Sequence, residues 1–273
     1  MAIHLNLITH GLGNNLFMLA AGLELALLTG SELVCHEKLE IKGSLDSVEH
    51  IAKSLHIEII HGLASQEKKL KTYTEFCPYC FDETFVKLQG DLILNGYFQN
   101  KKYHSNSKKI LLQAVRNSVQ EHLNPDLGVV NSVGLQIRLG DYKNRIIRKK
   151  IGLLPNRYYI DALQSLDVPH GSKVRIFSDS ASEALNIARK NFPNNFLFEE
   201  TTNFESPLEN LVALSHTRDL ILSNSTFGWW AAQLAEEFKI LRIAVAPKYW
   251  SRVNSCSRQL SNSEGVKLPH GWM

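Results

Sequence analysis

Hydrophobic stretches in the first half of the chain are separated by glycine and polar breaks, which predicts strands and helices in turn. An apolar stretch from Ala2 to Ile8 ends at the glycine-containing segment His10–Asn14, and a helix-forming segment follows from Leu16 to Leu28. The rest of this half predicts strands at 32–36 and 57–60, helices at 44–55 and 107–122, and mostly loop from 62 to 90.

The second half alternates more regularly between short apolar runs and amphipathic segments. It predicts strands at 133–139, 174–178, 196–198, 220–223 and 240–246, with helices between them at 156–166, 182–191, 207–215 and 226–238. This alternation favours parallel βαβ units, so we expect an α/β protein of two Rossmann-like domains with mainly parallel sheets. The domains are predicted at 1–131 and 132–273, joined by a linker at 124–131. Ligands of such sheets bind beyond the carboxyl ends of the strands.

Composition and charge narrow the class of protein. The 273 residues are 44% apolar and 21% charged, as in soluble globular proteins, and the net charge of +3 is too small for a general nucleic-acid binder. Arg138–Lys150 holds six basic residues and one acidic one, so it could face phosphate, an anionic lipid surface or solvent. Glu24 interrupts the longest apolar run, and no signal peptide is evident. We expect a soluble protein of a reducing compartment, with peripheral membrane attachment left open.

Cys77 and Cys80 have the spacing of a thiol–disulfide oxidoreductase site. No clear strand is predicted before them, and no second cysteine pair completes a zinc site. A redox protein that uses these two cysteines is kept as an alternative to the function developed below, and a metal site is not expected.

Two loops carry groups suited to binding an anion. The glycines of His10–Asn15 let the backbone approach a ligand at the start of a helix, although a plain tight turn explains them as well. Arg138 lies near the end of an apolar strand, where its charge is costly unless it meets an anion such as a phosphate. Asp141 could hold that guanidinium in an internal ion pair or act as a base.

A third loop, Ser223–Trp230, joins a strand to a helix through consecutive Asn, Ser and Thr residues. Hydroxyl and amide groups there meet the positive end of a helix dipole, which suits a diphosphate. The alternative is ordinary capping by Ser225 with Trp229 and Trp230 in the core, and for the two tryptophans we favour core packing.

Together these segments resemble the α-1,2-fucosyltransferases of glycosyltransferase family 11, in chain order and over nearly the whole sequence. The segments that carry the resemblance are Gly11-Leu-Gly-Asn-Asn-Leu-Phe17, Gly96-Tyr-Phe-Gln99 with Lys102-Tyr103, Gln136-Ile-Arg-Leu-Gly-Asp-Tyr142, Phe177-Ser-Asp179, Asn224-Ser-Thr-Phe-Gly-Trp-Trp-Ala231 and Ala246-Pro-Lys-Tyr-Trp250. The resemblance implies a GT-B arrangement, in which an N-terminal acceptor-side domain and a C-terminal GDP-sugar-binding domain face an interdomain cleft. It also implies an inverting, metal-independent and cofactor-free transfer of L-fucose from GDP-β-L-fucose to the 2-hydroxyl of a galactoside.

The resemblance further implies roles for individual residues. Arg138 would bind the β-phosphate and stabilise departing GDP, and Asp141 is the candidate base within the motif. The residues expected to bind the GDP-sugar are Gly11, Gly13, Asn14, Gln136, Asp179, Asn224, Ser225, Thr226 and Phe227. The acceptor would be a galactose-containing oligosaccharide or a lipid-linked glycan in bacterial O-antigen or other polysaccharide synthesis. No nucleic acid is expected as a partner, and the enzyme would be cytoplasmic or peripheral at the inner membrane.

The chain departs from the family motif at two positions. Gln136 stands where the motif has histidine, and Leu139 stands where it has a second arginine, so one phosphate-side charge is missing. Lys143 or Arg145 could replace that charge. Two alternatives therefore stay beside fucose transfer: transfer of another GDP-linked deoxy sugar such as colitose, and a GDP-sugar-binding protein with little turnover.

Overall fold

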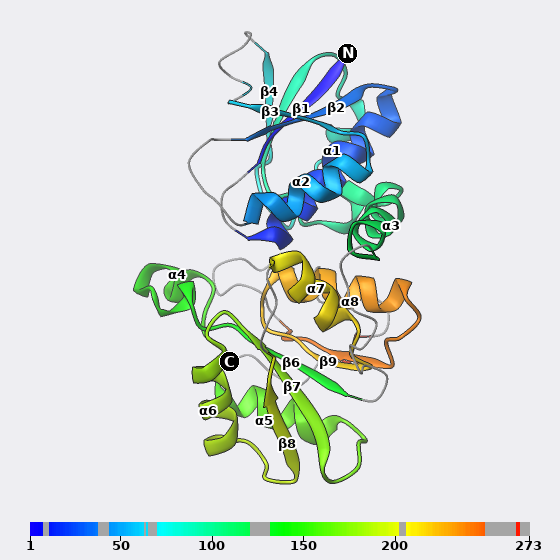
Figure 1. Ribbon diagram of the computed structural model, residues 1–273. Coiled ribbons are helices and arrows are strands. Elements are labelled where there is room, and N and C mark those ends of the chain that lie inside the picture. Colours follow the sequence, from blue (N-terminus) through cyan, green and yellow to red (C-terminus); the bar gives the residue numbers. More distant parts are fainter. Residues whose placement is uncertain are drawn as a thin grey trace. The chain divides into compact units, whose positions relative to one another are not determined.

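The structure is a computed structural model that describes residues 1–7, 11–37, 44–62, 64, 70–120, 132–201, 206–248 and 266–267. The chain divides into two compact units (Figure 1). The N-terminal unit comprises Met1–Leu123 with Ser206–Leu208, and the C-terminal unit comprises Asn124–Glu205 with Glu209–Met273. The domain boundary expected at residue 131 and the whole linker expected at 124–131 lie outside the described residues, so both stay predictions.

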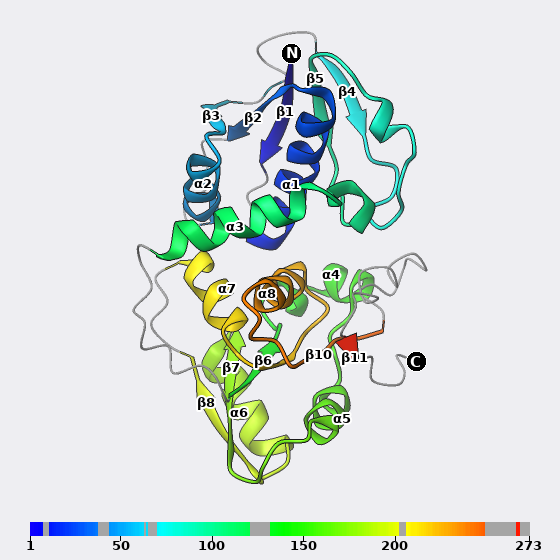
Figure 2. The ribbon, with the colours of Figure 1, turned by 90° about the vertical axis from the view of Figure 1, so that its right-hand side faces the viewer.

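The sheet of the N-terminal unit has five parallel strands in the order β3-β2-β1-β5-β4 (Figure 2). Its strands are β1 (Ala2–Leu7), β2 (Glu32–Glu37), β3 (Glu58–His61), β4 (Lys71–Thr74) and β5 (Leu92–Asn95). Residues of β1 alternate between the core and a half-buried face, as a strand of period two requires. β4 and β5 were not expected, because β4 is an exposed edge strand without an apolar pattern and β5 offers only three apolar residues.

Three helices, α1 (Leu12–Thr29), α2 (Ser44–Ser54) and α3 (Ser107–Gln120), pack against one another, and α1 lies against β1 and β2. Two 3-10 turns, η2 (Phe85–Lys87) and η3 (Lys101–His104), complete the unit. With 18 residues and a mean hydropathy of 1.4, α1 is long and apolar enough to cross a membrane. However, 72% of this segment is buried in the protein, as in the core helix of a soluble domain. Its Glu24 is also buried, where the carboxylate accepts the backbone N–H groups of Asn106 and Ser107 at the start of α3.

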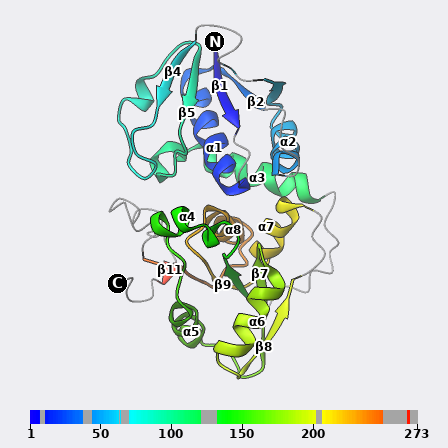
Figure 3. The same cartoon turned by 90° about the vertical axis from the view of Figure 1, so that its left-hand side faces the viewer.

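The C-terminal unit contains six parallel strands in the order β11-β10-β9-β6-β7-β8. They are β6 (Val133–Ile137), β7 (Ser172–Ser178), β8 (Phe196–Glu200), β9 (Asp219–Ile221), β10 (Ile243–Val245) and β11 (Val266–Lys267). Helices α5 (Asn156–Ser165) and α6 (Ala181–Asn191) cover one face, and α7 (Pro207–Ser215) and α8 (Thr226–Glu237) cover the other (Figures 1 and 3). The 3-10 turn η4 (Asp141–Lys143) and the short helix α4 (Arg145–Lys150) follow β6, where the sequence analysis expected only a loop or a charged surface segment.

Burial explains why β6 can occupy an inner position of its sheet. All five of its residues are buried, which is typical of a parallel strand that is covered by helices on both faces. Val133, Leu135 and Ile137 pack in one cluster with buried residues of α5 and α6. Each such side chain contributes about 1.5–3 kcal/mol to stability through its burial. Two parallel sheets with covering helices confirm the predicted α/β class and the two Rossmann-like halves.

Candidate active site

Arg138 lies directly beyond the carboxyl end of β6 and is held by a carboxylate from the neighbouring strand. Its Nε is 3.1 Å from Oδ2 of Asp179, the residue that follows β7, and both side chains are partly exposed. The other oxygen of Asp179 accepts the backbone N–H of Leu139 at 2.9 Å. Gly140 makes room for this carboxylate, because a Cβ at position 140 would lie 2.5 Å from Asp179 Oδ2. One carboxylate therefore fixes both the guanidinium and the backbone beside it.

A buried serine links β6 to β9 beneath this arginine. The Oγ of Ser223 accepts the backbone N–H of Arg138 at 3.1 Å and donates to the carbonyl of Gln136 at 2.8 Å. The phenol of Tyr159 lies 3.0 Å from the same oxygen and donates to it, since burial raises the pKa of Tyr159 well above its usual range and the serine proton is already used. The backbone at Arg138 is thus set by a saturated hydrogen-bond network.

Gln136 lies inside this network, below the surface of the site. Its Oε1 accepts the backbone N–H of Ser223 at 3.1 Å, and its side chain is buried against Gly228 of α8. A residue in this position can orient the loop after β9. Its expected contact with the GDP-sugar stays a prediction.

An aromatic ring and an asparagine join the guanidinium to the loop before α8. The ring centre of Tyr142 is 5.8 Å from Cζ of Arg138, and its hydroxyl donates to the carbonyl of Asn224 at 2.7 Å. The Asn224 amide donates to the carbonyl of Gly152 at 2.9 Å, while its Oδ1 is buried and accepts no hydrogen bond from any residue that the structure describes. Arg138, Tyr142 and Asn224 therefore form one connected group.

Helix α8 begins beside this group. Ser225 occupies the capping position with extended backbone angles, but its side chain makes no capping hydrogen bond, so the ordinary cap considered in the sequence analysis is wrong. Thr226 and Phe227, both partly exposed, form the first turn, whose amides have no acceptor within the helix. Trp229 and Trp230 are buried, which confirms their predicted place in the core. The helix presents partial positive charge on the same edge of the sheet as Arg138.

The basic segment after Arg138 is partly folded. Lys143 forms an ion pair with Glu183 of α6, and Asn144 caps α4 by accepting the N–H of Ile146 at 2.9 Å. Arg145 and Arg148 are exposed on α4, and 68% of Ile146 is exposed. The side chain of Asp141 lies outside the described residues, so both its pairing with Arg138 and its role as a base stay predictions.

The first predicted loop belongs to the N-terminal unit. Gly11 has φ +80°, a conformation that favours glycine, and α1 starts at the next residue, four residues earlier than expected. Gly13 and Asn14 lie in the first turn of α1, and Asn14 Oδ1 accepts the side-chain amide of Gln99 at 3.2 Å. Two segments that are far apart in the sequence, around Gly11 and around Gly96, therefore meet.

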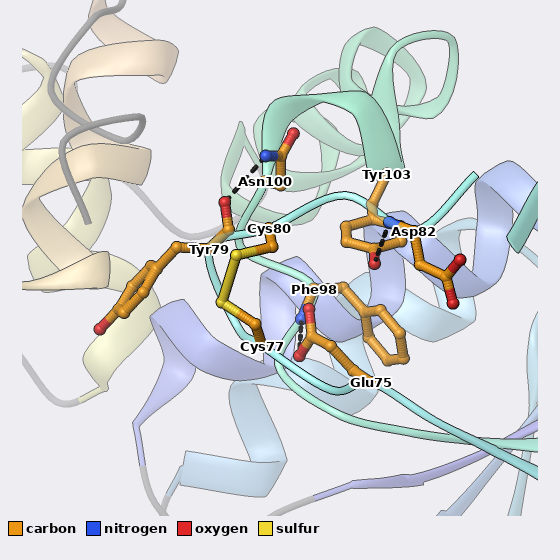
Figure 4. The surroundings of a disulfide bond; sticks show 8 residues. All are labelled: Glu75, Cys77, Tyr79, Cys80, Asp82, Phe98, Asn100 and Tyr103. Atoms are coloured by element: carbon orange, nitrogen blue, oxygen red, sulfur yellow. Dashed lines mark hydrogen bonds between the residues drawn. A yellow bond between two sulfur atoms is a disulfide. The ribbon is translucent and has the colours of Figure 1, made fainter. Parts of the chain in front are cut away.

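The expectation that no strand precedes the cysteine pair is wrong, because β4 ends at Thr74, shortly before Cys77. Cys77 and Cys80 form a disulfide (Figure 4). The loop between them is bonded to the segment after Gly96, since Gln99 N–H donates to the Pro78 carbonyl at 2.9 Å.

Ser223 and Gly228 lie within the loop Ser223–Trp230 that the sequence singles out, but no individual role was predicted for either of them. Tyr159 was not predicted as part of the C-terminal site. It had no local signal, because it reaches the site only through the packing of α5 on the sheet.

Comparisons with known proteins agree with these features. The sequence profile of glycosyl transferase family 11 matches residues 50–263. An alpha-1,2-colitosyltransferase from Escherichia coli is 26% identical over 280 residues, covering 92% of this chain and 93% of the relative. The O-antigen biosynthesis glycosyltransferase WbnK from Escherichia coli is 33% identical over 135 residues, covering 49% of this chain and 43% of the relative. The structure of the E. coli heptosyltransferase WaaC with ADP aligns with a TM-score of 0.52 at 8% identity, covering 98% of this chain and 92% of WaaC, which is a likeness of fold alone.

Proposed function

The chain belongs to glycosyl transferase family 11, and from that premise we propose that it transfers L-fucose from GDP-β-L-fucose to the 2-hydroxyl of a galactoside, with inversion. The observation that carries this proposal is the fixed guanidinium of Arg138 beside the start of α8. A departing GDP develops negative charge on its β-phosphate, and a preorganised cation with helix amides stabilises such charge at little reorganisation cost.

Arg138 suits this task because its position is set before any ligand arrives. Asp179 holds the guanidinium, and Ser223 fixes the backbone N–H of the same residue. An arginine that is already oriented loses less conformational freedom when it binds a diphosphate. The Asp179 carboxylate is already bonded to Arg138 and to the backbone N–H of Leu139. We therefore propose that Asp179 mainly holds Arg138 and that its contact with guanine or ribose is secondary.

Colitose is the second candidate for the transferred sugar. The observation that favours it is the alpha-1,2-colitosyltransferase that matches this chain over 92% of its length. Colitose is fucose without the 3-hydroxyl group. A site that hydrogen-bonds that hydroxyl rejects the deoxy analogue strongly, whereas a site lined by apolar groups separates the two sugars weakly.

The acceptor is proposed to be a galactose-containing oligosaccharide or lipid-linked glycan, by analogy with the O-antigen biosynthesis glycosyltransferase WbnK. Such an acceptor would bring the enzyme to the inner membrane from the cytoplasm. Exposed Ile146 among the basic residues of α4 supports peripheral contact with an anionic surface.

A donor and acceptor panel tests the proposal. The purified chain is mixed with GDP-fucose, GDP-colitose, GDP-mannose or UDP-galactose and with galactoside acceptors in EDTA, and we expect acceptor-dependent GDP release with one of the first two donors. The linkage of the isolated product should be α-1,2. Transfer from UDP-galactose alone would contradict the assignment of the donor class, and tight GDP-fucose binding without release by any acceptor would favour the binding-protein alternative.

A further inference from the structure

Glu75 lies at the carboxyl end of the N-terminal sheet, next to the segment that resembles a family motif. It follows β4 directly, and its backbone N–H donates to the carbonyl of Asn95, the last residue of β5, at 2.8 Å. Gly96 directly follows Asn95, so it lies just beyond the end of β5. β5 also pairs with β1, so Glu75, Gly96 and the Gly11 loop follow strands that end at one edge, where parallel sheets bind ligands.

The carboxylate of Glu75 fixes a strained turn. Its Oε2 accepts the backbone N–H groups of Tyr97 and Phe98 at 2.8 and 3.0 Å (Figure 4 shows the bond to Phe98). Phe98 has φ +53°, which is uncommon for a bulky residue, and its ring is fully buried. A Cβ at position 96 would lie 2.8 Å from Glu75 Oε2, so glycine is needed there. Strain of this kind is typically stored at functional sites.

The other side of the turn is held by the Cys77–Cys80 loop. The amide of Asn100 donates to the Tyr79 carbonyl at 2.8 Å, beside the disulfide (Figure 4). With the Gln99–Pro78 bond described above, the turn is tied at both ends. The side chain of Gln99 then reaches Asn14 of the Gly11 segment. The turn is therefore rigid and connects the two motifs of this unit.

The carboxyl group of Glu75 is more than a structural tie. Its Oε1 is shielded from solvent and accepts no hydrogen bond from any described residue. Burial raises the pKa of Glu75 to about 7, although the two N–H bonds to Oε2 oppose the shift. The titratable groups that interact with it, Tyr79 and Tyr103, are neutral phenols near pH 7. Oxygen Oε1 can therefore take up a proton near neutral pH.

Two residues next to this carboxyl group carry exposed aromatic rings: Phe76 follows Glu75 in the sequence, and Tyr97 donates its backbone N–H to Oε2. Phe76 is 70% exposed and Tyr97 is 42% exposed. Exposed aromatic side chains beside a few polar groups are typical of ligand sites, and their flat faces suit the apolar face of a sugar ring. This edge of the N-terminal unit thus offers both a surface for a sugar and a proton acceptor.

We propose that Glu75 is the general base of the transfer and that the turn Gly96–Gln99 belongs to the acceptor-sugar site. This inference rests on the proposed function. The acceptor O–H bond breaks as its oxygen forms a bond to C1 of the donor sugar, and the bond from C1 to the diphosphate breaks with its electron pair leaving on GDP. The proton passes to Glu75 Oε1 and is released when the product leaves, while Oε2 keeps its two backbone bonds.

The test compares Glu75→Gln and Glu75→Asp with wild type in the full chain, using the donor and acceptor that give most product. Glu83→Gln is the matched control, because Glu83 is an exposed carboxylate of the same unit that pairs with Lys102. For wild type we expect kcat to rise tenfold per pH unit below about pH 7 and to level off above it. Glu75→Gln should lower kcat by about 100- to 10,000-fold and abolish that rise. GDP affinity and the control should not change.

Each outcome decides the assignment. If Glu75→Gln retains the wild-type rate, or is slower while its kcat still rises through pH 7, Glu75 is only structural and the proposal fails. If Asp141→Asn loses this rise of kcat instead, the base is Asp141. If thermal melting shows that Glu75→Gln does not fold, Glu75→Asp decides. If Glu75 is the base, Glu75→Asp should be slower than wild type and its kcat should still rise with pH. An unchanged rate in Glu75→Asp would contradict the proposal. A wild-type chain that transfers no GDP-linked sugar would overturn the proposed function as well, whereas an active wild type with an unimpaired glutamine variant overturns this inference alone.

Discussion

At the scale of single residues, the arrangement around Arg138 separates charge from position. Asp179 and Ser223 set where the guanidinium and its backbone lie, and the proposed chemistry depends on the charge that they place there. Arg138→Ala removes the charge, whereas Arg138→Lys keeps it but loses the planar fork that pairs with Asp179.

We expect Arg138→Ala to lower kcat by about 100- to 1,000-fold, which is the loss found when one donor to a developing charge is removed. Arg138→Lys should fall between Ala and wild type. Initial rates of GDP release give both values. Arg157→Ala is the control, because Arg157 is an exposed residue of the same unit that pairs with Asp161 one helical turn away. An Arg138→Ala variant that turns over normally would remove Arg138 from the mechanism.

The sequence predicts some of these residues and cannot predict others, for a physical reason. A charge at the end of an apolar strand is costly, so Arg138 is conspicuous in the sequence. Glu75 is not, because its pKa depends on burial beside the turn Gly96–Gln99, which lies far from it in the sequence. Asp179 was expected to contact the nucleotide, but its position beside Arg138 follows from the pairing of β6 with β7. Contacts across strands depend on sheet order, which local sequence does not determine.

At the scale of elements, α8 approaches β6 closely at one point. Gly228→Ala would favour the helix by about 1 kcal/mol. The new methyl group would displace the buried Gln136 side chain and break its bond to Ser223 N–H, which costs about 1–3 kcal/mol. We expect a net loss of stability, measured by urea unfolding. In a Gln136→Ala background the same change should cost less, and equal costs in the two backgrounds would contradict this packing.

The disulfide is predicted to stabilise the N-terminal unit without taking part in catalysis. Closing a loop as short as Cys77–Cys80 is worth about 2 kcal/mol in the chain-entropy account. Cys77→Ser with Cys80→Ser should therefore lower stability by that amount, and a dithiol reductant should do the same to wild type. The transfer rate should stay within a few-fold. Complete loss of transfer in a well-folded double variant would revive the redox alternative.

Helices and strands were predicted with nearly correct bounds where apolar residues recur regularly along the segment. α7 was expected at its observed bounds, and β7 and α6 were expected within two residues of theirs. β4 was missed because it shows no apolar alternation, and β5 because it offers only three apolar residues, so only pairing in the sheet defines them. α4 was missed because its six residues are mostly charged, and its start depends on the Asn144 cap.

At the scale of the whole molecule, the two units can be followed separately. All four tryptophans of the sequence fall in the C-terminal unit, and the N-terminal unit contains none. If GDP binds the C-terminal unit, it should raise the free energy of unfolding of that unit, followed by tryptophan fluorescence, by about 2.7 kcal/mol at a GDP concentration 100 times Kd. Hydrogen exchange in α1 and β1 should change little. Stabilisation confined to the N-terminal unit would contradict the assignment of the donor domain.

The order of strands in the N-terminal sheet also governs how the chain can be made. β1 is synthesised before the other four strands of this sheet, yet it lies in the middle, and one of its edges pairs with β5, where Ile3 lies opposite Leu92. On a ribosome that adds about 5–20 residues per second, that edge stays open for several seconds. An apolar strand with an open edge is a template for aggregation. Expression of this protein should therefore benefit from lower temperature and from chaperones that bind nascent chains.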